Sequence, residues 1–296
     1  MVTIVITSQP KVPRTVLVTG AARGLGLETA LTLAASDWQV WAAVRSIESK
    51  DAVDAAARER GVRLHVVPMD VTNAASIEAT VEQVVRDSGG LDALVNNAGV
   101  TARAYFEDFP EKEIRRLFEV NLFGVMNVTR RVLPHMRARR RGRIVMISSI
   151  GGRIGSMCIA PYIATKFGLE GFSESLSLEL KPLGIDVVII EPGLVATELW
   201  QEQRRVLPSA RNPQSPYYKW FREEEKLAEA VLKSSHNAPS HVAEKVLLAL
   251  SVRRPRLRYV VGRRAQAVLS LRRHLPGELF ERIYFGEILR RIARPA

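Results

Sequence analysis

The stretch Thr15-Val16-Leu17-Val18-Thr19-Gly20-Ala21-Ala22-Arg23-Gly24-Leu25-Gly26 decides the fold of this chain. Its first four residues are a short, mostly apolar run that is typical of a fully buried strand. The glycines that follow predict a tight turn, because glycine adopts left-handed backbone angles without steric cost. After the turn, apolar residues recur at the spacing of a helix that packs on a sheet: Leu27, Ala30, Leu31 and Ala34. The stretch therefore predicts a strand, a glycine turn and a helix in direct succession.

The same alternation continues to about residue 190. Further apolar runs predict strands at Val40–Val44, Leu64–Val67, Leu91–Val95, Arg143–Ile147 and Asp186–Ile190. Between them, amphipathic or Ala-rich segments predict helices at Ser49–Arg60, Ser76–Arg86, Glu111–Met136 and Ala160–Leu180. Regular strand–helix alternation indicates an α/β fold with a doubly wound parallel sheet and helices on both faces, the Rossmann fold.

The rhythm changes after Pro192. A polar segment with scattered aromatic residues predicts a mobile lid at about 198–237. A helix at His241–Ser251 and a seventh strand at Tyr259–Gly262 follow, and then helices at Ala265–Leu275 and Leu279–Ile292. We therefore expect a flexible extension over 1–13, a catalytic domain over 14–262 that contains the lid, and a basic, amphipathic helical extension over 263–296.

Composition narrows the function classes. The 296 residues are long enough to bury a core without disulfides, and Cys158 is the single cysteine. One cysteine suits a reducing compartment. The N-terminal residues lack the apolar run of a secretory signal, and no run of about 18 apolar residues predicts a spanning helix. We therefore expect a cytoplasmic protein.

The glycine turn predicts a dinucleotide site. Gly20 permits the tight turn, Gly24 lets the backbone approach a pyrophosphate, and Gly26 lets helix and strand pack closely. The helix that follows offers free N–H groups and a partial positive charge to phosphates. A glycine trio alone is a weak signal, but here it lies in the required strand–turn–helix context.

Two arginines favour NADP(H) over NAD(H). Arg45 lies nineteen positions after Gly26, where an acidic residue would hold the ribose 2′-hydroxyl of NAD. Arg23 lies inside the turn itself. Two guanidiniums beside that ribose would pair with a 2′-phosphate through strong charge-assisted hydrogen bonds. The alternative is that both are solvated surface residues.

Tyr162 and Lys166 form the predicted catalytic pair. Their i, i+4 spacing on a predicted helix places both on one face. A neighbouring ammonium favours the phenolate and lowers the tyrosine pKa, so that Tyr162 can exchange a proton with an alcohol or a carbonyl. Ser149, just after the fifth predicted strand, would hold the substrate oxygen. Ser149 and Tyr162 are therefore the predicted substrate-binding residues.

With these motifs in order from about Thr15 to Leu199, the sequence resembles the short-chain dehydrogenase/reductase family. The residues that carry the resemblance are the turn 19–26, Asp70-Val71, Asn96-Asn97-Ala98-Gly99, Asn121, Ser149, Tyr162, Lys166, Pro192-Gly193 and Thr197. The resemblance implies that Asn121 joins Ser149, Tyr162 and Lys166 as a catalytic residue, by holding a water that relays protons. It also implies a cofactor site made of Gly20, Arg23, Gly24, Leu25, Gly26, Arg45, Asp70, Val71, Asn97, Ala98, Gly99, Tyr162, Lys166, Pro192, Gly193, Val195 and Thr197.

The resemblance implies a substrate pocket between Ile150–Pro161, the segment after Thr197 and the C-terminal tail. Aliphatic residues in the first segment favour an apolar pocket and a lipophilic substrate of steroid, retinoid or long-chain type. The aromatic residues of the lid either border this pocket or pack the lid onto the body. Two alternative functions stay open: a 3-oxoacyl-thioester reductase of lipid or polyketide synthesis, and a non-catalytic NADPH-binding regulatory protein.

The remaining expectations concern partners. The resemblance implies a homodimer or homotetramer through the helices at 111–136 and 160–180. The tail has twelve arginines and three glutamates between residues 251 and 296, and an apolar stripe at Phe285, Ile288, Leu289 and Ile292. It could lie on an anionic membrane, cover the substrate cleft or contact another subunit. The five arginines of 137–143 are more simply a solvated loop than a nucleic-acid site. Neither Cys158 nor the five histidines has metal-ligand spacing, so we expect no metal.

Overall fold

The computed structural model describes residues 14–195, 205–233 and 237–293. Its centre is a seven-stranded sheet in which every neighbouring pair of strands is parallel, with the order β3-β2-β1-β4-β5-β6-β7. The strands are β1 (Arg14–Thr19), β2 (Trp38–Val44), β3 (His65–Pro68), β4 (Ala93–Asn96), β5 (Gly142–Ile147), β6 (Ile185–Pro192) and β7 (Arg258–Val261). The predicted doubly wound sheet of seven strands is confirmed.

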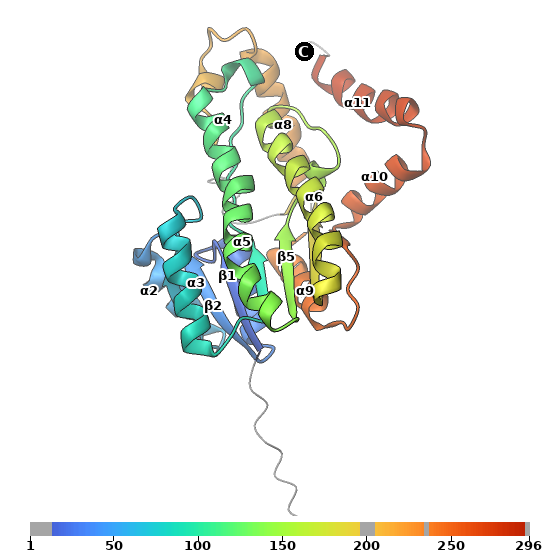
Figure 1. Cartoon of the computed structure of the whole chain (residues 1–296). Coiled ribbons are helices and arrows are strands. Elements are labelled where there is room, and N and C mark those ends of the chain that lie inside the picture. The colour runs from blue at the N-terminus through green and yellow to red at the C-terminus, as the bar shows by residue number, and fades with distance from the viewer. Residues whose placement is uncertain (1–13, 196–204, 234–236, 294–296) are drawn as a thin grey trace, which may run out of the picture.

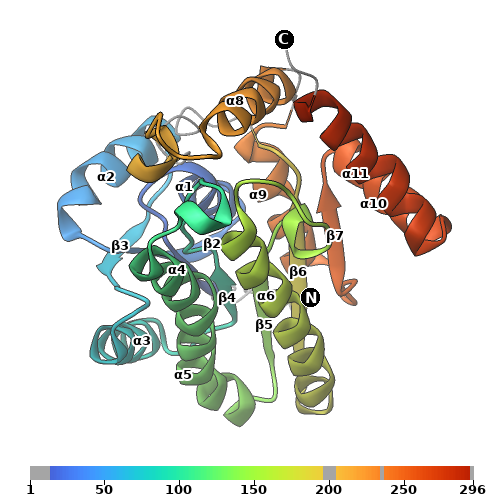
Figure 2. The same ribbon diagram turned by 90° about the horizontal axis from the view of Figure 1, so that it is seen from above.

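Helices cover both faces of this sheet (Figures 1 and 2). One face carries α1 (Gly24–Ala34), α2 (Lys50–Glu59) and α9 (Pro239–Ser251). The other carries α3 (Ala74–Ser88), α4 (Glu111–Phe118), α5 (Gly124–Ala138) and α6 (Ala160–Leu180). Along β1, Val16 and Val18 pack toward α1, whereas Leu17 packs toward the other face, and all three are fully buried. Burial on both sides explains why the strand sequences are continuously apolar rather than alternating.

The predicted helix at Glu111–Met136 is not regular. A π-helical turn, Glu119–Phe123, separates α4 from α5. Such a turn inserts one extra residue, and here it accompanies a polar side chain, Asn121, with no solvent exposure. The 3.6-residue periodicity of the sequence does not reveal one inserted residue.

Residues 139–141 form an exposed loop between α5 and β5, as predicted for the arginine run, and its side chains also make specific contacts. Arg139 and Arg141 both donate to Asp92 Oδ1, over 2.9 and 2.7 Å. Arg143 donates to the carbonyls of Ala249 and Val252 over 2.6 and 2.9 Å. These bonds join the end of α5 to the amino-terminal edge of the sheet and to α9.

The glycine turn is fixed to the neighbouring strand by two polar side chains. Thr19 Oγ1 accepts from the backbone N–H groups of Asn97 and Ala98, each over 3.0 Å. Asn97 Nδ2 in return donates to the carbonyls of Thr19 and Gly20 over 2.9 and 3.1 Å. The amide of Asn97, a predicted cofactor residue, thus also holds the turn in shape.

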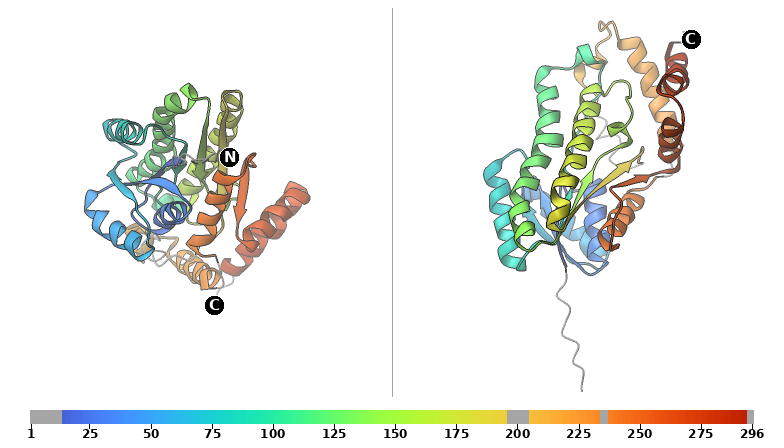
Figure 3. Two further views of the ribbon diagram at one scale, coloured as in Figure 1. Left: turned by 90° about the horizontal axis from the view of Figure 1, so that it is seen from below. Right: turned by 45° about the vertical axis from the view of Figure 1, so that its right-hand side comes forward.

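Beyond β6 the chain forms α8 (Tyr218–Lys233), α9 and β7, and then two terminal helices, α10 (Arg263–His274) and α11 (Gly277–Ala293). Figure 3 shows α10 and α11 as an arm beside the carboxyl edge of the sheet. The helices at 265–275 and 279–292 are thus confirmed, each beginning two residues earlier than expected. No helix among the described residues is long and apolar enough to cross a membrane. The first thirteen residues and residues 198–204 of the predicted lid lie outside the described residues.

Gly26→Ala tests the packing of the turn. A Cβ at Gly26 would overlap Gly20 O and Asn97 Nδ2, so the turn and β4 would have to separate. We expect the free energy of unfolding to fall by about 2–3 kcal/mol and NADPH affinity to be lost. Chemical denaturation and fluorescence titration measure the two effects.

Gly171→Ala is the matched control. Gly171 lies in α6 and a Cβ there meets nothing within 4 Å, so stability should be unchanged or rise by about 1 kcal/mol. Wild-type NADPH affinity in Gly26→Ala would contradict the assigned role of the turn.

Candidate active site

A cavity of about 1360 Å³ opens at the carboxyl edge of the sheet. Several segments border it: the loop after β5, the first turn of α6, the segment after β6, and helices α8, α10 and α11. The carboxyl ends of parallel strands are where ligands bind in open α/β sheets, so this cavity is the candidate active site.

Ser149 and Tyr162 both border this cavity. Ser149 follows β5 and caps a short 3₁₀ turn, since its Oγ accepts from Gly151 N over 3.0 Å. Tyr162 lies in the first turn of α6, where Pro161 is tolerated because its missing N–H has no helical partner there. Residues thirteen apart in the sequence are therefore brought to the same cavity.

Lys166 lies one helical turn after Tyr162, and only 6% of its surface is exposed. Its ammonium donates to Ile147 O over 2.9 Å, and Nζ lies 5.7 Å from the centroid of the Tyr162 ring. Helix α6 is thus pinned to the last residue of β5. This bond places the ammonium beneath the phenol ring, on the same side of the sheet.

Burial dominates the electrostatics of this pair. It raises the pKa of the Tyr162 phenol, while hydrogen bonding with Ser149 lowers it in part. Burial also lowers the pKa of Lys166 to about 8, against an opposing effect of Glu170. The expected lowering of the tyrosine pKa is not found in the isolated chain, because desolvation of the phenolate outweighs the hydrogen bond with Ser149.

The side chain of Asn121 is fully used by protein partners. Its Oδ1 accepts from Val100 N and its Nδ2 donates to Val100 O, each over 2.8 Å. The amide also donates to Thr165 Oγ1 over 3.2 Å. These bonds tie the loop after β4 to the π-turn and to α6, one residue before Lys166. The side chain therefore has a bracing role that the sequence did not predict.

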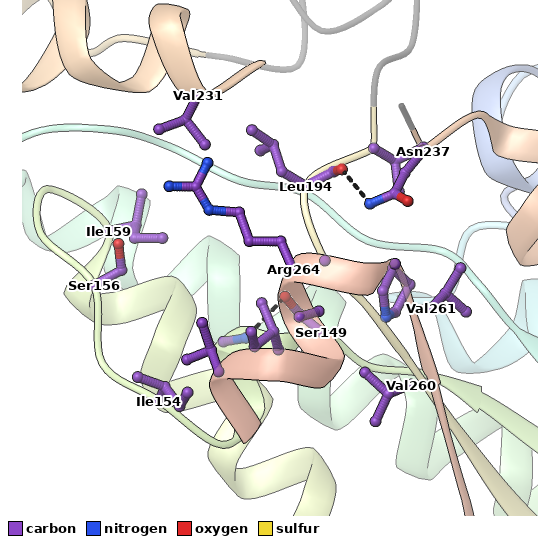
Figure 4. Close-up of a pocket in the computed structure, with 18 of the residues that line it drawn as sticks. Ser149, Ile154, Ser156, Ile159, Leu194, Val231, Asn237, Val260, Val261 and Arg264 are labelled. Atoms are coloured by element: carbon purple, nitrogen blue, oxygen red, sulfur yellow. Dashed lines mark hydrogen bonds between the residues drawn. The ribbon is translucent and has the colours of Figure 1, made fainter. Parts of the chain in front are cut away.

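The structure brings together part of the predicted cofactor set. Leu25, Pro192, Gly193 and Val195 border the cavity together with Ser149 and Tyr162. The segment after β6 is held in place because Gly193 N donates to Val261 O over 2.9 Å, and Asn237 donates to Leu194 O over 3.1 Å (Figure 4). Thr197 lies outside the described residues.

The remaining cofactor candidates lie around the glycine turn and the ends of β2, β3 and β4. Gly20 and Gly24 have the left-handed backbone angles expected of the turn. Arg23 and Arg45 are exposed, whereas Asp70 is half-buried and accepts from Thr72 N over 2.9 Å. Val71 is buried, and Ala98 and Gly99 follow the Asn97 bracket.

These residues fit a dinucleotide. A Cβ at Gly20 would lie 2.8 Å from Ala98 Cα, so the turn is closed to larger residues. Helix α1 has no side-chain cap and no acidic residue in its first turn, which leaves its N-terminus suited to phosphate. No group of three His, Cys, Asp or Glu in the described part of the chain could hold a metal.

A buried ionic network behind the cavity was not predicted. Glu191, the residue before Pro192, has no solvent exposure and bonds Arg153 over 3.0 Å. Arg258 of β7 lies 3.5 Å from Glu191 and 3.1 Å from Glu170, one turn beyond Lys166. The network joins α6, β6 and β7 to the segment Ile150–Pro161, which we call the substrate loop. The spacing of these residues carries no signal, because each comes from a different element.

The terminal arm covers the cavity. Val268 and Leu271 of α10 and Ile283, Tyr284 and Ile288 of α11 border it. Of the three uses left open for the tail, the structure thus favours covering the substrate cleft.

The aromatic residues of the lid and its aliphatic residues face different surroundings. Tyr217 stacks on Tyr105 with ring centroids 4.8 Å apart, and Phe221 is buried against the body, so these rings pack the lid. Leu227 and Val231 of α8 border the cavity instead. Cys158 is buried, and burial raises the pKa of its thiol, as expected for a core residue.

Comparisons with known proteins agree with this arrangement. The short chain dehydrogenase family matches residues 14–207. The chain is 35% identical to the uncharacterized oxidoreductase YusZ of Bacillus subtilis, over 90% of this chain and 95% of that protein. It is 33% identical to retinol dehydrogenase 8 of Bos taurus, over 91% and 88%. A short-chain dehydrogenase structure from Streptomyces avermitilis has a TM-score of 0.78 and 33% identity, over 95% of this chain and 99% of that one.

Lys166→Met tests the burial of the ammonium. Because the folded-state pKa of Lys166 is about 8 rather than 10.5, keeping it charged at pH 7 costs on the order of 3 kcal/mol. That cost is present below pH 8 and disappears as the pH rises toward 10.5. We measure the free energy of unfolding of both proteins by urea denaturation. The value for the variant minus the value for the wild type should fall by about 2 kcal/mol between pH 7 and pH 9.5.

Lys219→Met, in the exposed part of α8, is the matched control and should show the same difference at both pH values. A pH-independent difference in Lys166→Met would mean that the ammonium is not desolvated.

Proposed function

The chain belongs to the short-chain dehydrogenase family, and on that premise we propose that it is an NADP(H)-dependent oxidoreductase that interconverts a secondary or primary alcohol and a ketone or aldehyde. The oxidoreductase class, acting on CH–OH groups, is that of its family. One observation supports the finer proposal most: Ser149 and Tyr162 border a single large cavity, directly beside the buried Lys166. The aliphatic lining favours a lipophilic substrate of steroid, retinoid or long-chain type.

In this proposal the glycine turn and the segment Pro192–Val195 hold the cofactor, and Lys166 and Tyr162 contact its nicotinamide end. The bound cofactor supplies or accepts the hydride of the reaction. The protein contributes orientation and the movement of one proton. Asp70 and Val71 follow the end of β3 and would contact the adenine.

Tyr162 moves the proton. Burial raises the pKa of its phenol, so the group is protonated at neutral pH and ready to donate to a carbonyl oxygen. Ser149 holds that oxygen and shares its developing charge. In the oxidative direction the phenolate accepts the hydroxyl proton, and the Lys166 ammonium stabilises it. Asn121 donates to Thr165, the residue before Lys166, and so helps to position Lys166. The proposed proton relay passes beside these hydrogen bonds.

Tyr162→Phe tests the proton transfer. Loss of the hydroxyl should lower kcat by at least about a hundredfold, since general acid catalysis contributes that much. NADPH affinity should change less than threefold, because the ring remains. NADPH absorbance with a panel of lipophilic ketones and aldehydes measures the first, and fluorescence titration the second.

Tyr105→Phe is the control, because Tyr105 lies outside the cavity and stacks on Tyr217. Wild-type kcat in Tyr162→Phe would end the proposed acid–base role. Binding of NADPH with no turnover of any substrate by the wild type would instead favour the regulatory alternative.

Arg23 and Arg45 support the preference for NADP(H). Both are exposed near the carboxyl ends of β1 and β2, which are neighbouring strands. Arg45 forms no ion pair with any described residue, so its guanidinium is available to a phosphate. A 2′-phosphate would receive charge-assisted hydrogen bonds from this pair.

Arg45→Asp tests this preference. Removal of a charge-assisted bond, together with repulsion from the new carboxylate, should raise the KM for NADPH at least about tenfold. The KM for NADH should stay constant or fall. Arg63→Asp makes the same charge change at an exposed position after α2 and should leave the cofactor ratio unchanged. An unchanged ratio in Arg45→Asp would exclude the phosphate contact.

We also propose that the chain forms a homodimer or homotetramer through the face of α5 and α6. Three large apolar side chains are exposed there: Phe123 at 45%, Phe167 at 42% and Leu178 at 75%. Exposed apolar residues gathered on neighbouring helices are typical of subunit contacts.

A further inference from the structure

One arginine in the cavity has no role in the mechanism. Arg264 lies in the first turn of α10, three residues after the last residue of β7. Its side chain extends into the cavity between Leu194 and Ile159, toward Val231 and away from Ser149 (Figure 4). The neighbours that surround it come from the segment after β6, the substrate loop and α8.

No acidic residue of the cavity pairs with this guanidinium. Glu224 forms its ion pair with Arg103, and Glu287 lies 3.7 Å from Arg290. Arg264 has no hydrogen bond and no ion pair with any residue that the structure describes. It does not stabilise its helix either, because a cation at a helix N-terminus opposes the helix dipole.

The surroundings of Arg264 combine apolar walls with hydroxyl groups. Ile154, Ile159 and Val231 are aliphatic, while Ser156 presents its hydroxyl on the same side of the cavity (Figure 4). Tyr284 of α11 borders the same cavity, and its pKa is raised by burial and lowered in part by the Arg264 charge. The remaining cations, Arg263 and Lys245, also border the cavity.

A lipophilic ligand that fills this cavity removes water from the guanidinium. Such desolvation is costly unless the ligand brings its own anion. Arginine forms paired hydrogen bonds with carboxylate and phosphate, whose oxygens match its planar fork. The cavity is large enough for both an apolar chain and such a group.

We propose that Arg264 is the anion subsite of this cavity and that the substrate is a lipophilic carbonyl compound or alcohol that carries a carboxylate or phosphate ester away from the reacting oxygen. Ser156 and Tyr284 complete the subsite through their hydroxyl groups. This inference rests on the proposed function, since it assigns the substrate class of the same cavity. It adds a specificity-determining residue outside the segment that matches the family.

The test compares matched substrates with NADPH. The pair 12-oxododecanoic acid and its methyl ester has the same chain and the same aldehyde, but only the acid is charged. A third substrate, acetoacetyl-coenzyme A, places the anion on phosphate groups of a carrier. We expect the wild type to show a kcat/KM at least about tenfold higher for one of the two anionic sources than for the ester. The anionic substrate with the higher kcat/KM identifies which anion, carboxylate or phosphate, the subsite binds.

The variant Arg264→Gln should abolish that preference, and Arg264→Glu should invert it. The preference should also weaken as NaCl is raised, because a charge at the mouth of the cavity is screened. Arg273→Gln, on the same helix but outside the cavity, makes the same change of net charge and should keep the wild-type ratio.

Three results separate the possible failures. Equal kcat/KM values for acid, ester and thioester in the wild type overturn the anion subsite but leave the proposed function standing. A raised KM for NADPH in Arg264→Gln, with an unchanged substrate ratio, also overturns it, because Arg264 would then contact the cofactor. Reduction of none of the three substrates, nor of any uncharged ketone or aldehyde, would count against the proposed function itself.

Discussion

The common direction of the seven strands is the constraint on which the site depends. Because every strand runs the same way, all carboxyl ends lie along one edge of the sheet. The glycine turn follows β1, Ser149 follows β5 and Pro192 ends β6, so groups more than 170 residues apart in sequence meet there. The bracket between Thr19 and Asn97 then fixes the relative positions of β1 and β4 at that edge. The direction of the strands determines where the site lies, and polar side chains at the strand ends make the site rigid.

Desolvation governs the chemistry of the catalytic pair. Burial acts in opposite directions on the two groups, raising the pKa of Tyr162 and lowering that of Lys166, so the protein on its own favours a neutral phenol and a weakened ammonium. This arrangement suits donation of a proton to a carbonyl, the step that reduction requires. Proton acceptance in the reverse direction requires further positive charge near the phenol. The buried network of Glu191, Arg153 and Arg258 joins the surrounding segments of β6, β7 and the loop after β5.

The C-terminal third of the chain converts an open edge into an enclosed cavity. Helices α8, α10 and α11 supply aliphatic side chains to its walls, and they also supply the charged groups that distinguish one substrate class from another. Arg103 and Glu224 neutralise each other across the lid, whereas Arg264 is left for a ligand. The excess of arginine in the tail therefore has more than one role. Part of it faces the cavity, and Arg272 bonds Arg153 O and joins the arm to the substrate loop.

The sequence by itself determined the fold and the positions of the proposed catalytic pair. Apolar runs, helical periodicity and the glycine turn are local patterns, and local patterns depend on residues close together in the chain. For the same reason the i, i+4 spacing of Tyr162 and Lys166 was sufficient to place them on one face. The sequence failed where one residue alters a regular element, as in the π-turn at Asn121.

Only the tertiary structure decided the sign of the pKa shifts, the partners of Asn97 and Asn121, and the position of the terminal arm. Each of these depends on contacts between elements that are distant in sequence, and desolvation depends on how completely those elements exclude water. Arg264 shows the difference most clearly. In the sequence it is one of many arginines in a basic tail, and only its direction into an apolar cavity sets it apart.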